Sequence, residues 1–336
     1  VGDSTKTGVA GALAINVVTS TVEALARTGA DVDLNGADLL LTATSTTKSL
    51  THALPLEDMM TSESLGLGAS VALAIIDTDS RAAVEDAAVV NNADKILLSA
   101  TGTHRTGTKA VGGAEATGSS ATVITPVVAM SFMYGDTLAE IGTGGLLTTT
   151  GRLGVAAAHD SEFVTEAKGD AEGGSTTVGA SLALTGSEET SRARLRRDLM
   201  IGGTIDVTAS GIFGAVTEAE ASAAGAEEDD DMSAADDDRV NQESQSQLDH
   251  GNTQSAARTG EGSDETDTPD ASSSEGSISV AAAIAMAFGN TESSAVIADG
   301  VSVTADEVVT LRSSGNTDST VTADGSASNG SSGTVG

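Results

Sequence analysis

The feature that most limits the fold of this 336-residue chain is an internal repeat of about 57 residues. Residues 8–18 (GVAGALAINVV) align with residues 66–76 (GLGASVALAII), and three further copies follow. The first column of equivalent residues is Leu13, Val71, Val128, Leu182 and Ile284. Its successive spacings are 58, 57, 54 and 102 residues, so the last interval is longer than the others.

Two further columns repeat with nearly the same spacings. One contains Ala24, Ala82, Ala139, Ala193 and Ala295, and the other contains Ala43, Ala100, Ala157, Ala209 and Ser313. In all three columns the spacing is longest between the fourth and fifth copies, where residues 227–275 intervene. The spacings therefore predict five structural repeats and one insertion, rather than unrelated consecutive domains.

The insertion has a composition of its own. It holds 16 of the 49 carboxylates and only two of the basic residues, and its end is rich in serine. A segment this charged buries too little apolar surface to offset the entropy of ordering it, so we expect a disordered or loop insertion. The predicted organisation is repeats one to four over residues 1–226, the acidic insertion over 227–275, and repeat five with a polar Gly/Ser-rich tail over 276–336.

The apolar residues of each repeat alternate as in β-strands, because Val71, Leu73 and Ile75 share one face. Alanine-rich residues 281–288 could form a helix by propensity, but the aligned copies contain proline and β-branched residues. About 18 residues separate the second and third columns, which suggests three coils in each 57-residue repeat. We therefore expect an all-β, right-handed β-helix (β-solenoid).

Composition agrees with a narrow, stacked interior. The chain has four Phe, one Tyr and no Trp against 39 Gly, so small inward side chains must fill the core. With three coils in each repeat the molecule would be a narrow rod. Its open ends, near Gly8 and Thr322, would continue into further coils or stack on another chain, so we expect self-association end to end or as a filament.

Charge and residue usage exclude several classes of partner. A formal net charge of −33 repels nucleic acid and anionic lipid, and favours attraction of cations. The longest nearly apolar stretch, residues 123–134, is too short to cross a bilayer, so we expect no membrane span. The chain has no cysteine and therefore no disulfide framework.

The repeats resemble the giant repetitive surface proteins of bacteria, namely the filamentous haemagglutinin-like and leukotoxin-like repeat adhesins. The resemblance lies in GLGASVALAII followed by DTDSRAAVEDAAVV and ADKILLSATG, and in VGASLAL followed by SRARL and GGTIDVTASG. It covers nearly everything outside residues 227–275. It implies a right-handed β-helix and a role at the cell surface or in a matrix, without implying a catalytic activity or any particular binding residue.

Pairs and runs of aspartate are the candidate metal ligands, because calcium prefers several carboxylate and carbonyl oxygens. No loop has the spacing of a known calcium motif, so diffuse cation binding by an acidic surface is the alternative. The candidate ligands are Asp77, Asp79, Asp229, Asp230, Asp231, Asp236, Asp237 and Asp238.

The sequence also contains one basic run. Residues 191–198 (SRARLRRD) place Arg192, Arg194 and Arg196 on one strand face. We interpret them as intramolecular partners of neighbouring acids, with a docking patch for an acidic partner as the alternative. No motif identifies a nucleophile, a general base or a cofactor site, so neither catalytic residues nor a required cofactor are predicted.

These patterns indicate a structural or adhesive segment of a long secreted or cell-surface repeat protein, acting as a stalk, filament or matrix. It would lie outside the cell, bind a cell-surface or carbohydrate ligand, and have no catalytic function. One alternative is a carbohydrate-active β-helix enzyme resembling a polysaccharide lyase. Another is a cation-binding protein of an extracellular matrix.

Overall fold

Long β-strands laid side by side make up the molecule. The computed structural model describes residues 6–55, 60–118, 120–225, 278–329 and 334–335. Within these ranges the regular structure consists of strands alone, so the predicted all-β class is confirmed. The Ala-rich residues 281–288 lie within strand β14, and not in a helix. The predicted insertion, residues 227–275, lies outside the described residues.

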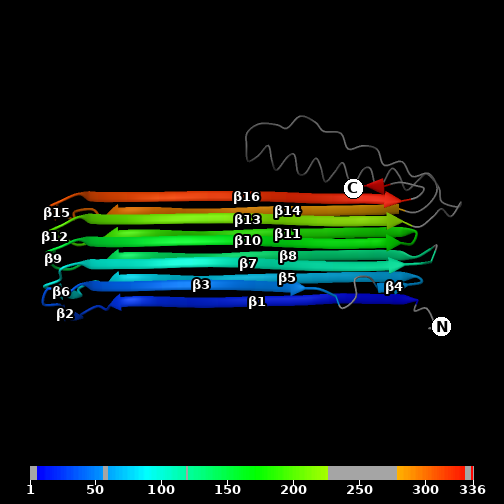
Figure 1. Cartoon of the computed structure of the whole chain (residues 1–336). Coiled ribbons are helices and arrows are strands. Elements are labelled where there is room, and N and C mark those ends of the chain that lie inside the picture. Colours follow the sequence, from blue (N-terminus) through cyan, green and yellow to red (C-terminus); the bar gives the residue numbers. More distant parts are fainter. Residues whose placement is uncertain (1–5, 56–59, 119, 226–277, 330–333, 336) are drawn as a thin grey trace, which may run out of the picture.

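Two large sheets face each other, and every neighbouring pair of strands within them is parallel (Figure 1). Sheet 1 contains β1 (Thr7–Ala26), β5 (Leu65–Val84), β8 (Thr122–Ile141), β11 (Thr176–Leu195), β14 (Ile278–Ile297) and the short β17 (Thr334–Val335). Sheet 2 contains β3 (Leu39–Ala53), β7 (Ile96–Ala116), β10 (Leu153–Gly173), β13 (Ile205–Gly225) and β16 (Val309–Asn329), and β4 (Met60–Ser62) also pairs with β7.

Short strands join the two sheets at one end of the molecule. They are β2 (Asp31–Asp33), β6 (Val89–Asn91), β9 (Leu147–Thr149), β12 (Leu199–Ile201) and β15 (Val303–Ala305). The chain thus passes along sheet 1, through a short strand and back along sheet 2. Figure 1 shows the long strands of the two sheets running in opposite directions.

The register confirms the three columns predicted from the repeat. In sheet 1, Leu13 pairs with Val71 and Ala82 with Ala139. In sheet 2, Ala43 pairs with Ala100 and Ala157 with Ala209. Because β11 pairs directly with β14, the ladder crosses the 102-residue interval without a gap. Equivalent residues of successive repeats are therefore neighbours along one stacking axis.

The prediction of three coils in each repeat is wrong. Each long strand pairs with the strand one full repeat later, so one repeat is a single winding with two strands of about 20 residues. The 18-residue interval from Ala82 to Ala100 is instead the passage from the end of β5, through β6, into β7. Strands of about 20 residues are rare, so ordinary strand lengths predict several short strands where the chain forms one continuous strand.

The winding also corrects the expected narrow rod. Twenty residues in extended conformation span roughly 66 Å, whereas five stacked strands span only about 24 Å. The described part of the chain is consequently a slab, longer along its strands than along its stacking axis (Figure 1). A rod would require many more windings than the five described.

Small side chains fill the space between the sheets, as predicted. In β5 every second residue points inward and is buried. These residues are Gly66, Gly68, Ser70, Ala72, Ala74, Ile76, Thr78, Ser80, Ala82 and Val84. Larger apolar side chains, including Ile96, Leu153 and Ile205, collect near the short strands. The interior is thus widest at that end, and the sheets approach closely where Gly68 faces Gly113 and where Gly179 faces Ser222.

Hydroxyl groups link the two sheets through the middle of the slab. Thr165 donates to Ser131 at 2.9 Å, Ser131 donates to Thr108 at 2.7 Å, and Thr185 donates to Thr165 at 2.8 Å. Thr185 and Thr217 are also 2.8 Å apart. Buried hydroxyls cost stability unless they are hydrogen-bonded, and here they satisfy one another.

Candidate functional site

The candidate calcium ligands within the described residues do not form a metal site. Asp77 and Asp79 lie on the outer face of β5, and both are exposed. Burial raises the pKa of Asp79, and repulsion from Asp77, Asp136 and Glu23 raises it further. Across the described ranges, no group of three or more His, Cys, Asp or Glu side chains is arranged to hold a metal ion. Asp229, Asp230, Asp231, Asp236, Asp237 and Asp238 lie outside the described residues.

The basic run pairs with acids of the same molecule, as the sequence indicated. Arg192 contacts Asp136 of the neighbouring strand at 2.7 Å. Arg196 lies 3.5 Å from Glu140 and 3.9 Å from Asp86. Arg192 thus neutralises an acid on the preceding winding, and Arg196 lies beside acids on the two preceding windings.

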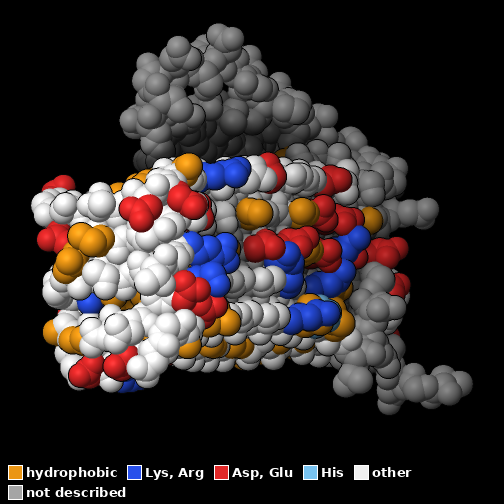
Figure 2. Space-filling view, turned by 60° about the vertical axis from the view of Figure 1, so that its left-hand side comes forward, with side chains coloured by type: hydrophobic (Ala, Val, Ile, Leu, Met, Phe, Trp, Pro, Cys, Tyr) orange, Lys and Arg blue, Asp and Glu red, His pale blue; other side chains and the backbone are white. Residues whose placement is uncertain are grey.

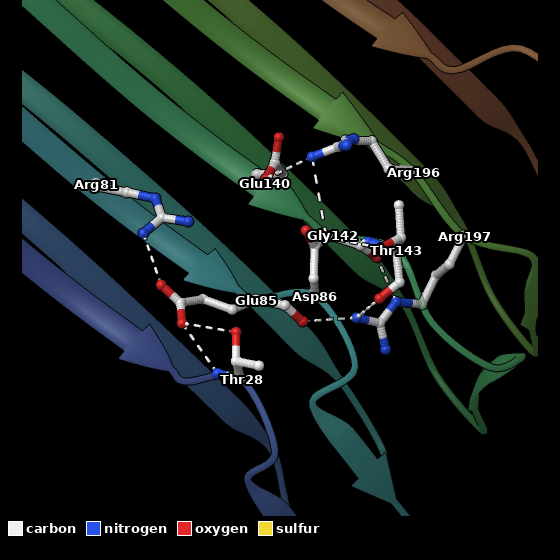
Figure 3. A network of polar contacts seen from close by, with 9 residues as sticks. All are labelled: Thr28, Arg81, Glu85, Asp86, Glu140, Gly142, Thr143, Arg196 and Arg197. Carbon is white, nitrogen blue, oxygen red and sulfur yellow. Dashed lines mark hydrogen bonds and ion pairs between the residues drawn. The ribbon is translucent and has the colours of Figure 1, made fainter.

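Arg197, which the sequence did not single out, joins three successive windings at the corner near the short strands (Figure 3). It is 4% exposed. Its guanidinium donates to the carbonyl oxygens of Gly142 at 2.5 Å, Ala88 at 2.7 Å, Glu85 at 2.8 Å and Thr143 at 3.0 Å. Burial lowers the pKa of Arg197. This one side chain bonds to four backbone acceptors of the turns, of which Glu85 and Thr143 also accept the N–H groups of Ala88 and Ala87.

Two carboxylates connect the same corner to its neighbours (Figure 3). Glu85 accepts from the backbone N–H of Thr28 at 2.9 Å and from Arg81 at 2.7 Å, and these bonds lower its pKa. Asp86 accepts from the backbone N–H of Thr143 at 2.6 Å, which lowers its pKa. Each carboxylate therefore fixes the turn of one winding to the turn of the next.

Replacing Arg197 with methionine should destabilise the fold by about 4 kcal/mol, because four acceptors lose charged donors and two or more remain buried. Urea unfolding followed by circular dichroism would measure the loss. The matched control is Arg194→Met, since Arg194 lies three residues earlier on the outer face. Equal stability of the two variants would contradict the assigned role of Arg197.

A second polar cluster lies between the sheets. The rings of His104 and His159 are 4.9 Å apart, and each approaches a threonine hydroxyl, Thr78 at 3.3 Å and Thr137 at 2.9 Å. His159 Nε2 lies 3.6 Å from Glu189 Oε2. Burial lowers the pKa of both histidines to about 4 and raises the pKa of Glu189.

The same cluster brings serine, histidine and a carboxylate together, but in a sealed interior. Ser161 and Ser187 each donate to Glu189 Oε1 at 2.5 Å. Ser161, His159 and Glu189 are at most 2% exposed. A nucleophile needs a route to its substrate and an unengaged hydroxyl, so we assign this cluster to the fold and not to catalysis.

The outer face of sheet 2 carries interleaved charges, which Figure 2 shows as blue and red side chains. Arg105 contacts Asp160 at 2.9 Å and Glu162 at 3.0 Å, and Lys109 contacts Glu166 at 2.6 Å. A hollow of about 440 Å³ lies among them, above Gly107. Exposed ion pairs of this kind contribute little to stability, so this face is a solvated, charged surface.

The outer face of sheet 1 has the opposite character, and we take it as the candidate interaction site. Five successive outward positions on each of five strands carry an apolar side chain or glycine, and we call this surface the apolar block. Its residues are Val9, Gly11, Leu13, Ile15 and Val17 on β1; Leu67, Ala69, Val71, Leu73 and Ile75 on β5; Ile124, Pro126, Val128, Met130 and Phe132 on β8; Val178, Ala180, Leu182, Leu184 and Gly186 on β11; and Val280, Ala282, Ile284, Met286 and Phe288 on β14.

Exposure of the block is highest on its two border strands. Leu13 is 70% exposed on β1, and Ile284 and Phe288 are 54% and 53% exposed on β14. The block ends where Asp77 and Glu188 occupy the next outward positions.

The sequence correctly placed Val71, Leu73 and Ile75 on one face, but it did not show that this face points outward. A signal for the outward direction was available. The residues that alternate with this set, Ala72, Ala74 and their equivalents, are small enough to fill a narrow interior.

Comparison with known proteins finds no matching family model, no matching curated protein and no matching solved structure. Separately, none of the described residues belongs to a helix long and apolar enough to span a membrane.

Proposed function

We propose that this chain is a structural, non-catalytic segment of an extracellular or cell-surface repeat protein, built as a right-handed β-solenoid that lengthens by adding windings. Crossovers between parallel strands of one sheet are right-handed in nearly all proteins, which supports that hand. The expected adhesive role belongs to the same proposal, since both outer faces are presented to the surroundings. Binding of a carbohydrate or a cation would use these faces.

The observation that carries the proposal is that the two edges of the slab present matching interior residues. In sheet 2, Thr47 and Ser49 on β3 share columns with Thr317 and Ser319 on β16. In sheet 1, Ala24 on β1 shares a column with Ala295 on β14. A further winding placed on either edge would therefore meet small hydroxyl or alanine side chains that match its own at these positions. It would also pair the edge backbone groups that β17 leaves free.

Charges on the outer face favour the same stacking. Lys48 on β3 and Asp318 on β16 belong to one outward column. In a second copy stacked in continuous register, Lys48 would lie beside Asp318 of the first, about 5 Å away along the axis. Opposite charges would thus meet where two copies join.

The proposal predicts concentration-dependent assembly along the stacking axis. Small-angle scattering and electron microscopy should show slabs joining into filaments of constant cross-section as concentration rises. Lys48→Glu should weaken assembly about tenfold by placing two acids together at each junction. The double variant Lys48→Glu, Asp318→Lys restores opposite charges and should restore assembly. Compact particles that do not lengthen at any concentration would contradict the proposal.

A further inference from the structure

The apolar block is larger than the exposed apolar patch of an ordinary soluble chain. Five strands about 4.8 Å apart and five outward positions about 6.6 Å apart cover roughly 800 Å². The largest apolar patch on a typical monomer covers roughly 300–600 Å². All-parallel sheets are also nearly always covered on both faces, yet sheet 1 is covered only on its inner face by the described residues. Among the described residues, nothing thus covers the block.

We propose that a second copy of this chain covers the block, so that two molecules pack sheet 1 against sheet 1. An area near 800 Å² on each partner is that of a standard stable interface. The block is uncharged at all 25 positions, so the same block on a second copy is an apolar surface that does not repel it. This contact uses the sheet face and not the strand edges, and it stands independently of the proposed end-to-end stacking.

Acidic residues beyond the block determine how the two copies are oriented. The outward positions after the block hold the acids Glu23, Asp77, Asp79, Asp136, Glu188 and Glu292 against the bases Arg81, Arg192 and Arg194, so this half of the face is net acidic even though Arg192 pairs with Asp136. If the strands of the two copies ran in the same direction, these acids would face each other. If the strands run in opposite directions about the middle column of the block, the blocks overlap and the acidic halves project on opposite sides. Like-charge repulsion therefore selects the antiparallel dimer.

Sedimentation equilibrium tests the dimer directly. With edge stacking weakened by Lys48→Glu, the otherwise intact chain should sediment at twice the 33.0 kDa mass of one copy. The variant Val71→Asp, Leu182→Asp places charges in the centre of the block and should raise the dimer dissociation constant roughly a hundredfold or more. Val216→Asp is the matched control, because Val216 is an exposed valine on the outer face of sheet 2. Circular dichroism and melting temperature establish that each variant is folded.

Three results would overturn the proposal: an intact chain that remains monomeric at high micromolar concentration, a block variant that dimerises as tightly as the intact chain, or a loss of dimer in Val216→Asp equal to that in the block variant. Filaments joined at strand edges would not mimic the expected result, since Lys48→Glu weakens those filaments and leaves the face-to-face dimer intact.

Cross-linking tests the orientation, because the chain has no cysteine and each variant then carries a single thiol. Val128→Cys lies in the middle column of the block on β8 and should be joined to its counterpart by a short bismaleimide across about 10 Å. Tyr134→Cys lies six residues further on, so the two thiols of an antiparallel dimer would be about 40 Å apart and should not react. Efficient cross-linking through residue 134 would contradict the antiparallel arrangement.

Discussion

Replacing Gly68 with leucine should destabilise the chain by about 3 kcal/mol or more and remove most of the folded protein from the soluble fraction. A Cβ atom at this position would lie 2.7 Å from the carbonyl carbon of Gly113 on the facing sheet, and closer still to its oxygen. Backbone cannot move aside as a flexible side chain can. The two sheets would have to separate, and the small side chains around them would lose their contacts.

The matched control is Ala69→Leu, one residue later on the same strand. Ala69 points away from the interior and belongs to the apolar block. The two substitutions add leucine to the same strand, but only the first adds it between the sheets. Urea unfolding of both variants should show a large loss for Gly68→Leu and a change of less than about 1 kcal/mol for Ala69→Leu. Similar losses for the two would contradict the tight approach of the sheets.

Mild acid should destabilise the fold through His104 and His159. Their pKa values are about 4 in the folded chain because burial disfavours the charged imidazolium, and in His104 the neighbouring His159 and Arg105 add to this effect. An unfolded histidine has a pKa near 6.5. Above pH 6.5 neither state binds the proton, so the full stability is present. Between pH 6.5 and 4 the unfolded state binds it first, and stability is lost as the pH falls.

The expected loss from the two histidines is about 3 kcal/mol between roughly pH 7.5 and 5.5. Denaturant unfolding at several pH values would measure it. Asp160 and Asp136 oppose the effect at His159 by attracting a proton, and Glu189, whose pKa is raised, regains stability when it is neutralised at lower pH. The variant His104→Asn, His159→Gln should lose most of the pH dependence in this range. An unchanged slope in that variant would contradict the assignment.

The repeat predicted the ladder well, because parallel strands place equivalent residues of successive windings side by side. The spacing from Ala82 to Ala139 therefore gave the register directly, and the structure confirms it. The length of each winding was not predictable by the same argument, since a column fixes which residues stack and not how many bends separate them. One feature of the sequence does indicate the long strand: residues 65–84 contain no turn sequence, and they form a single strand.

The sites depend on contacts that no column contains. Arg197 satisfies carbonyl groups on two earlier windings, at Ala88 and Gly142, and only the folded corner brings these together. His104 and His159 come from different repeats and different register columns. They meet because β7 and β10 are paired and the two columns are adjacent, so the rings are diagonal neighbours. The pairing of Arg192 with Asp136 was predictable, because both lie on outer faces of adjacent repeats.

Because strand-to-strand hydrogen bonds join successive windings, the force needed to separate two windings depends on where the tension is applied. These bonds run along the stacking axis, whereas the covalent backbone runs across it. Tension applied uniformly along the axis loads every bond of a 20-residue ladder together, so the force is shared and rupture is difficult. Tension applied at one corner loads the bonds one after another, and an edge winding should peel away at low force as a unit of about 57 residues.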